Sequence, residues 1–322
     1  MPTALSLPPR ALPRRFRQPR LLLAGCGDVA ARIARQLNAH GPRYRIHALL
    51  RHEPGSPAWA AWRALGTTPI AADLDQARSL RRLRGIADSV IYLAPPAENH
   101  AADCRLNRFL AALHGGRSLP RRLVLIGTTG VYGDRQGALT DETCPVHPHT
   151  ARAKRRVASE QTLRRWRRGR SRAGLGDTPT GGILRVPGIY AADRLPTDRL
   201  RSGTPALRPE DDTWTNHIHA DDLARISWLA LYRSGTVRAI NTVDLSELKM
   251  GDWFDAVADA TGLPRPERLP RAQLKTRVSP MLYSFMSESR RLDNKRLLNE
   301  LRFRLRYPTV HDFLATLKVP PC

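Results

Sequence analysis

The sequence predicts an α/β protein with a doubly wound parallel sheet and a smaller C-terminal subdomain. Strand-like apolar runs alternate with helical patterns from residue 20 to residue 190, a glycine turn follows the first run, and proline interrupts the chain repeatedly after residue 190. Such alternation is typical of Rossmann-type sheets joined by right-handed crossovers. We expect a disordered basic arm over 1–19, a Rossmann domain over 20–190 and a substrate-covering subdomain over 191–322 that is interleaved with the sheet.

The first β-α-β unit is the clearest local pattern. Residues 20–25 form a short apolar run, and the segment that follows carries Val29, Ile33 and Leu37 at helical spacing. Gly41 is expected to end this helix. Residues 44–51 then predict a second strand, which would pair in parallel with the first.

The alternation continues along the rest of the chain. Further strands are expected near residues 71–73, 88–96, 123–133, 182–190 and 239–244. Further helices are expected over 76–83, 103–114, 221–235, 249–261 and 287–301. An exposed loop is expected over 169–182 and a proline-rich linker over 263–270.

Charge is the most unusual global feature. The chain carries 53 basic and 29 acidic residues, a formal net charge of +24. Residues 152–172 are the densest basic segment, with Glu160 as their single acid, and only Trp166 is aromatic there. Because no aromatic platform or recognition motif accompanies these charges, we do not expect nucleic acid as a native partner. A small anionic substrate fits this charge better.

Cysteine spacing and hydropathy bear on metal binding, disulfide formation and membrane association. The four cysteines, Cys26, Cys104, Cys144 and Cys322, have no spacing typical of metal ligands or of a disulfide framework. We therefore predict no metal site and a reducing, cytoplasmic location. No uncharged apolar run reaches the ~18 residues that a membrane span needs, so no membrane association is expected.

A glycine motif predicts where a dinucleotide binds. Gly25, Gly27 and Ala30 form a GxGxxA pattern between the first strand and the first helix. The first glycine permits a tight turn, the second lets the backbone approach a pyrophosphate, and the alanine allows close helix packing. The start of the helix attracts phosphate through its unpaired N–H groups. An ordinary βα turn is the alternative, but the strand–helix–strand context favours a NAD(P) site. The residues expected to contact the cofactor are Gly25, Cys26, Gly27, Asp28, Val29, Ala30, Arg51, His52, Asp73, Leu74, Leu93, Ala94, Pro95 and Pro187.

The end of the second strand selects between the two nicotinamide cofactors. Arg51 and His52 follow this strand, where an acid would bind the adenosine ribose of NAD. A guanidinium can instead pair with a 2′-phosphate, so NADP is favoured. Glu53 could be the ribose-binding acid if the loop bends differently, which keeps NAD open. Asp73 and Leu74 are expected near the adenine.

At this point the sequence resembles the extended short-chain dehydrogenase/reductases, also called NAD-dependent epimerase/dehydratases, and most of all their atypical YeeZ-like branch. The resemblance runs over residues 20–311 and implies a NAD(P)-dependent reaction on a small carbonyl or hydroxyl substrate. It also implies a homodimer that pairs through two helices of each subunit. Beside the glycine motif, the matching segments are 72–74, 91–94, 126–133, 183–190 and 216–222.

The catalytic residues implied by the resemblance are incomplete. The family uses a Ser/Thr, for which Thr128 stands here, and the Tyr and Lys of a YxxxK motif, which act as general acid and base. If Lys154 is the lysine, Thr150 occupies the Tyr position; in the other register the pair becomes Arg152 and Arg156. No tyrosine occurs between residues 132 and 190.

Other side chains could replace the missing phenol. They are Tyr132, Tyr190, His147, His149, His217 and His219. Of these we expect Tyr132 to complete a catalytic set with Thr128 and Lys154. His217 and His219 flank Ile218 and are expected on one face of a strand, where a structural role beside the next helix is favoured over catalysis.

Three functions remain open from the sequence. The leading one is an atypical oxidoreductase or epimerase. The second is a catalytically inactive NAD(P)-binding sensor or partner-docking module, which the missing tyrosine favours. The third is a nucleic-acid binder that uses residues 152–172.

Overall fold

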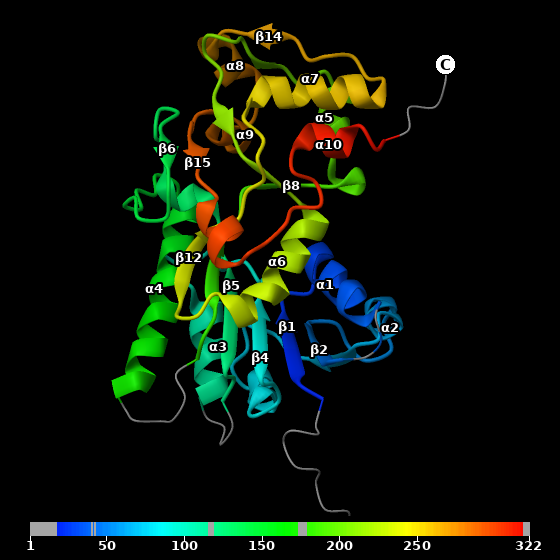
Figure 1. Ribbon diagram of the computed structural model, residues 1–322, viewed down its shortest axis with the longest axis vertical. Helices are drawn as coiled ribbons and strands as arrows, with labels where there is room; N and C mark the ends of the chain where they lie inside the picture. Colours follow the sequence, from blue (N-terminus) through cyan, green and yellow to red (C-terminus); the bar gives the residue numbers. More distant parts are fainter. Residues whose placement is uncertain (1–17, 40, 42, 115–118, 173–178, 318–322) are drawn as a thin grey trace, which may run out of the picture.

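The computed structural model describes residues 18–39, 41, 43–114, 119–172 and 179–317. A central sheet carries helices on both faces, and a lobe built mostly from later parts of the chain sits over one end of the strands (Figure 1). The predicted basic arm over 1–19 lies outside the described residues, apart from Gln18 and Pro19. No helix in the described ranges is long and apolar enough to cross a bilayer.

The main sheet has seven parallel strands in the order β12-β7-β5-β4-β1-β2-β3, which confirms the predicted fold class. The strand order reverses between β1 and β4, and a crevice is expected there at the carboxyl ends of the strands. The strand bounds are β1 (Arg20–Ala24), β2 (Arg45–Leu50), β3 (Thr68–Ala71), β4 (Ser89–Tyr92), β5 (Arg122–Ile126), β7 (Gly182–Arg185) and β12 (Arg238–Asn241).

Helices cover both faces of this sheet and bury its apolar side chains. On one face α1 (Asp28–Asn38) and α6 (Ala220–Arg233) pack against each other and share one apolar core. On the other face the short turn η2 (Ser79–Leu83), α3 (Cys104–His114) and α4 (Ala151–Arg172) contribute to a second core. Residues 220–241 therefore return to the Rossmann unit from the later half of the chain.

The lobe has a third apolar core and lies over the carboxyl ends of the strands (Figure 1). Its helices are α5 (Thr197–Arg201), α7 (Met250–Thr261), α8 (Arg271–Arg277), α9 (Pro280–Met286) and α10 (Val310–Leu314), beside the turn η4 (Ala192–Arg194). Its strands pair two by two: β8 (Gly188–Tyr190) with β11 (His217–His219), β9 (Ala206–Leu207) with β14 (Arg268–Leu269), β10 (Trp214–Thr215) with β13 (Leu248–Lys249), and β6 (Leu139–Thr140) with β15 (Arg291–Leu292).

The prediction of one helix over 287–301 is wrong. The segment forms β15 and then a single π turn, η5 (Arg296–Glu300). Asn216 explains the extended start, because its side chain donates to the carbonyl of Arg290 and accepts from the amide of Leu292, at 2.9 and 3.0 Å. These tertiary bonds override the helical spacing of arginine and leucine.

Three local differences from the sequence prediction accompany this one. The structure adds α2 (Pro57–Ala64), which Ser56 caps by accepting from the amide of Trp59. The helix expected over 76–83 is the tight turn η2. The exposed loop expected over 169–182 begins later, because α4 continues to Arg172; residues 173–178 lie outside the described part.

Candidate functional site

Three adjoining cavities form a groove along the carboxyl edge of the sheet. The first cavity has about 210 Å³, the middle cavity about 380 Å³ and the third cavity about 430 Å³. Gly25 lines the first and the middle cavity, while Thr128 and Pro187 line both the middle and the third. The groove therefore runs from the glycine turn to the lobe, past the point where the strand order reverses.

The glycine turn is fixed by steric contacts on one side and open on the other. Gly25 has a φ of +98°, and a Cβ there would lie 2.3 Å from the amide nitrogen of Ala94. Gly27 has a φ of −108° and precedes α1, and no atom lies within 4 Å of the place where its Cβ would be. The open side faces the middle cavity, so a phosphate can approach the start of the helix there.

The first cavity contains the residues predicted to select the cofactor. Arg51 and His52 are exposed at the end of β2 and line this cavity, whereas Glu53 does not. The sequence analysis missed Arg105 of α3, which also lines it and pairs with Asp75 at 2.6 Å. Six other predicted contact residues line it as well: Gly25, Cys26, Asp73, Leu74, Ala94 and Pro95.

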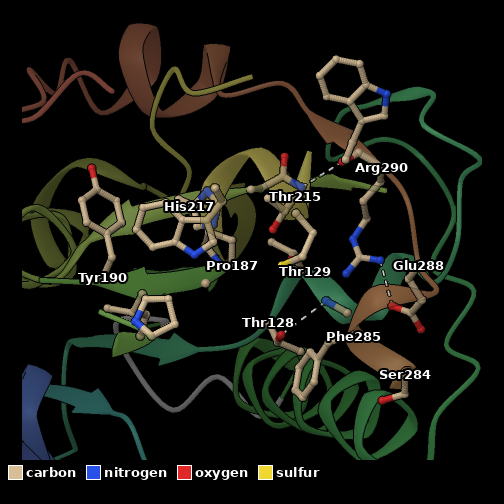
Figure 2. A pocket seen from close by; sticks show the side chains of 18 of the residues that line it. Thr128, Thr129, Pro187, Tyr190, Thr215, His217, Ser284, Phe285, Glu288 and Arg290 are labelled. Carbon is tan, nitrogen blue, oxygen red and sulfur yellow. Dashed lines mark hydrogen bonds and ion pairs between the residues drawn. The ribbon is translucent and has the colours of Figure 1, made fainter. Parts of the chain in front are cut away.

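The middle cavity contains the remaining predicted contact residues, and Thr128 lies at its far end. Asp28, in the first turn of α1, pairs with Arg32 at 3.0 Å and with Arg194 at 3.2 Å. Thr128 accepts from the amide of Gly130 at 3.3 Å and lies beside Phe285 (Figure 2). The predicted contact residues here are Gly25, Gly27, Asp28, Val29, Ala30, Leu93 and Pro187.

Helix α4 presents arginines to the groove in place of a Tyr–Lys pair. Thr150 caps this helix by accepting from the amide of Ala153 at 3.1 Å. Arg152 lines the middle and third cavities, and Arg156 lines the middle cavity one turn later. Lys154 is exposed and lines none of the three cavities, so the structure does not bring it together with Thr128 in the groove. Two residues turn a helix by about 200°, which places Lys154 on the side away from Arg152.

Tyr132 does not face the groove either. It is fully buried, its hydroxyl donates to Asn241 Oδ1 at 2.7 Å, and it accepts from Arg185 Nη1 at 2.8 Å. Burial raises the pKa of Tyr132 to about 12. The hydroxyl is thus committed to interior partners and is not presented to the groove beside Thr128, where a catalytic acid would be needed.

The other candidate acids are also occupied or unable to donate a proton. The Tyr190 ring lines the third cavity, but its hydroxyl is directed to the carbonyl of Thr309 at 3.5 Å. His219 caps α6 by accepting from the amide of Asp221. His217 lines the third cavity, and burial lowers its pKa to about 3, so the imidazole is neutral near pH 7.

His147 and His149 lie outside the groove. Their rings contact each other at a centroid distance of 4.6 Å, and neither residue lines any of the three cavities. None of the candidate residues that the structure describes therefore offers a free acid proton beside Thr128.

The third cavity combines positive charge with aromatic surface. Among the described residues that line it, Glu288 is the one carboxylate, and it pairs with Arg290 at 2.8 Å (Figure 2). Four arginines and five large aromatic side chains contribute to its wall, so it suits an anionic ligand that also has an apolar or planar part. They are Arg152, Arg194, Arg199, Arg290, Tyr190, Trp214, Trp253, Phe254 and Phe285.

Comparison with known proteins places this groove in a structural context. No protein-family model and no curated protein matches the sequence. A functionally unknown conserved protein from Silicibacter pomeroyi is similar in structure, with a TM-score of 0.72, 26% identity and coverage of 93% of this chain and 98% of that one. A "putative NAD-dependent epimerase/dehydratase" from Methylobacillus flagellatus has a TM-score of 0.67 and 25% identity, over 94% of this chain and 98% of that one. The chain has the fold of the NAD-dependent epimerase/dehydratases.

Two less similar structures contain ligands and share this fold. MoeE5 in complex with UDP-glucose and NAD has a TM-score of 0.68 and 18% identity, over 93% of this chain and 97% of that one. The human epimerase family protein SDR39U1 with NADPH also has a TM-score of 0.68, with 17% identity over 92% of this chain and 98% of that one. Proteins of this fold thus bind either nicotinamide dinucleotide, and MoeE5 also binds a nucleotide sugar.

Proposed function

We propose that the chain binds NADP(H) along the first and middle cavities and acts as an atypical oxidoreductase or epimerase of the YeeZ-like branch. The observation that carries this proposal is the continuous groove, which leads from the open glycine turn to Thr128 and on into the lobe. NAD(H) is the alternative cofactor. The nicotinamide would supply hydride transfer, while Thr128 would orient the substrate oxygen beside it.

Arg51 supports the choice of NADP over NAD. Its exposed guanidinium lines the first cavity and can pair with a 2′-phosphate, whereas Glu53 lies outside the lining. Arg105 adds a second guanidinium to the same cavity, although Asp75 already pairs with it.

Replacing Arg51 by aspartate is expected to weaken NADPH binding about tenfold or more and to leave NADH binding equal or stronger. A charge-assisted hydrogen bond contributes about 1.5–3 kcal/mol, and the new carboxylate would repel the phosphate. Titration followed by nicotinamide fluorescence measures both affinities. Arg45→Asp, an equal charge change at the exposed start of β2, is the matched control. Equal losses for both cofactors in Arg51→Asp would contradict a 2′-phosphate contact.

Replacing Gly27 by alanine is expected to abolish dinucleotide binding and leave the unfolding midpoint nearly unchanged. The new methyl group meets no protein atom within 4 Å, so it would stand in the space proposed for the pyrophosphate. Gly25→Ala is the contrast, because its Cβ would collide with the backbone at Ala94 and lower stability as well. Thermal unfolding and NADPH titration separate the two effects. Normal NADPH binding by Gly27→Ala would show that the turn is only architectural.

The third cavity is proposed to bind the substrate, an anionic small molecule with a carbonyl or hydroxyl group. Its four arginines suit phosphate or carboxylate groups, and its aromatic side chains suit a sugar or a base. MoeE5 binds UDP-glucose within the same fold, which makes nucleotide sugars the first class to screen. We also propose that the chain forms a homodimer, which the molar mass from sedimentation velocity would test.

A NAD(P)-binding sensor without hydride chemistry is the second candidate function. Arg152 and Arg156 favour it, because they line the groove where the resemblance implies a Tyr–Lys pair, and a guanidinium does not release its proton. Turnover of one nucleotide sugar, aldehyde or ketone, lost in Thr128→Val, would support the enzyme. Binding of NADPH without any turnover across the screen would support the sensor.

A further inference from the structure

Arg194 lies where the lobe meets the glycine turn. It ends the short turn η4, which follows β8, and it lines both the middle and the third cavity. Its Nη1 is 3.2 Å from Oδ2 of Asp28, the first residue of α1. A side chain of the lobe therefore reaches the start of the helix at which the proposed function places the pyrophosphate.

Asp28 has a second cationic partner besides Arg194. Arg32 binds both oxygens of the Asp28 carboxylate at 3.0 Å, and it also contacts Asp193 and Asp221 at 2.7 and 2.8 Å. Arg32 is largely buried and lines none of the three cavities. Of the two guanidiniums on Asp28, Arg194 is the one that faces the middle cavity.

The Asp28–Arg194 pair is well suited to exchange partners. The Arg194 side chain is 36% exposed, and a partly exposed ion pair contributes little net stability. A pyrophosphate offers several charged oxygens in the geometry that a guanidinium binds with two parallel hydrogen bonds. It would also approach the Asp28 carboxylate, whose repulsion a nearby cation must offset. Arg194 can meet both demands from its present position.

We propose that Arg194 is a ligand of the dinucleotide pyrophosphate, supplied by the lobe rather than by the Rossmann unit. The inference rests on the proposed function. The chain continues from Arg194 through Pro196 to Arg199, and all three line the third cavity. A pyrophosphate that holds Arg194 thereby also holds one wall of the third cavity.

The first test compares ligands that do and do not contain a pyrophosphate. Arg194→Ala is expected to weaken NADPH and ADP-ribose binding about tenfold or more and to leave adenosine 2′-monophosphate binding unchanged in calorimetry. Arg194→Lys should recover part of the lost affinity, since lysine keeps the positive charge but cannot form the two parallel hydrogen bonds of a guanidinium. Arg201→Ala is the matched control, because Arg201 lies on α5, pairs with Asp198 and lines none of the three cavities.

The second test separates direct contact from neutralisation of Asp28. If Arg194 only cancelled the Asp28 charge, its removal would have no effect in an Asp28→Asn background. We expect Arg194→Ala to cost NADPH affinity in both backgrounds, and Asp28→Asn alone to bind NADPH more tightly. Loss of the Arg194 effect in the Asp28→Asn background would overturn the proposal.

The third test follows the wall of the third cavity directly. NADPH is expected to slow amide hydrogen exchange over residues 192–199 in the unsubstituted protein but not in Arg194→Ala. Equal protection in both proteins would overturn the link to the lobe. If the unsubstituted protein binds no dinucleotide, the proposed function itself fails. If the unsubstituted protein binds NADPH and Arg194→Ala binds it equally well, the proposed function stands and only the inference about Arg194 fails.

Discussion

Glu160→Ala is expected to lower the free energy of unfolding by about 3–5 kcal/mol, the usual cost of leaving a buried charge without its partner. Glu160 of α4 and Arg185 of β7 form two hydrogen bonds of 2.9 Å, and their side chains are 2% and 4% exposed. Without the carboxylate, the guanidinium keeps only Tyr132 as a hydrogen-bond partner among the described residues.

The position of this ion pair explains why its loss affects more than two residues. Arg185 donates to the Tyr132 hydroxyl, and Tyr132 donates to Asn241 in the neighbouring strand β12. The network therefore joins α4, β7, β12 and the turn that begins after Thr128, within the structure that supports the groove. A buried polar network of this kind stabilises a single packing of its helices and strands only if every polar group in it has a hydrogen-bond partner.

Urea unfolding of three variants measures the effect. Glu160→Ala/Arg185→Met should recover most of the lost stability, because the stranded charge is gone. Asp259→Ala, which breaks the exposed pair with Arg265, should barely move the midpoint. If Glu160→Ala resembled Asp259→Ala, the ion pair would not contribute to stability as argued.

Local patterns were enough to predict the Rossmann unit and its glycine turn. The apolar runs of β1 and β2 and the helical spacing of α1 depend on near neighbours, and the Gly25 turn lies directly between them. Each predicted cofactor residue lines the first or the middle cavity for the same reason: strand ends of a parallel sheet meet at one edge.

Contacts between distant segments could not be predicted in this way. The phase of α4 decides that Arg152 and not Lys154 enters the groove, and it depends on the Thr150 cap and on packing. Arg194 and Arg290 reach the cavities from lobe segments that carry no motif. Their roles follow from their position in the tertiary structure, which no short sequence pattern predicts.

Asp244 is expected to make the protein less stable as the pH rises from about 4 to about 7. The residue is 5% exposed, and burial raises the pKa of its carboxyl from 3.8 to about 7, although the amide of Ser246 donates to it at 2.9 Å. Nearby Asp222 disfavours a second negative charge. The neutral form is thus favoured in the folded state, so the stability it contributes is complete below pH 4 and lost through pH 7.

Asp244→Asn should remove this dependence. A shift of about three pKa units corresponds to about 4 kcal/mol, and the amide imitates the neutral carboxyl in shape. Urea unfolding of both proteins at pH 5 and pH 8 isolates the contribution, because all other titrating groups are shared. The variant should gain stability relative to the unsubstituted protein at pH 8 and much less at pH 5. Parallel pH profiles would mean that the pKa of Asp244 is the same in the folded and the unfolded protein.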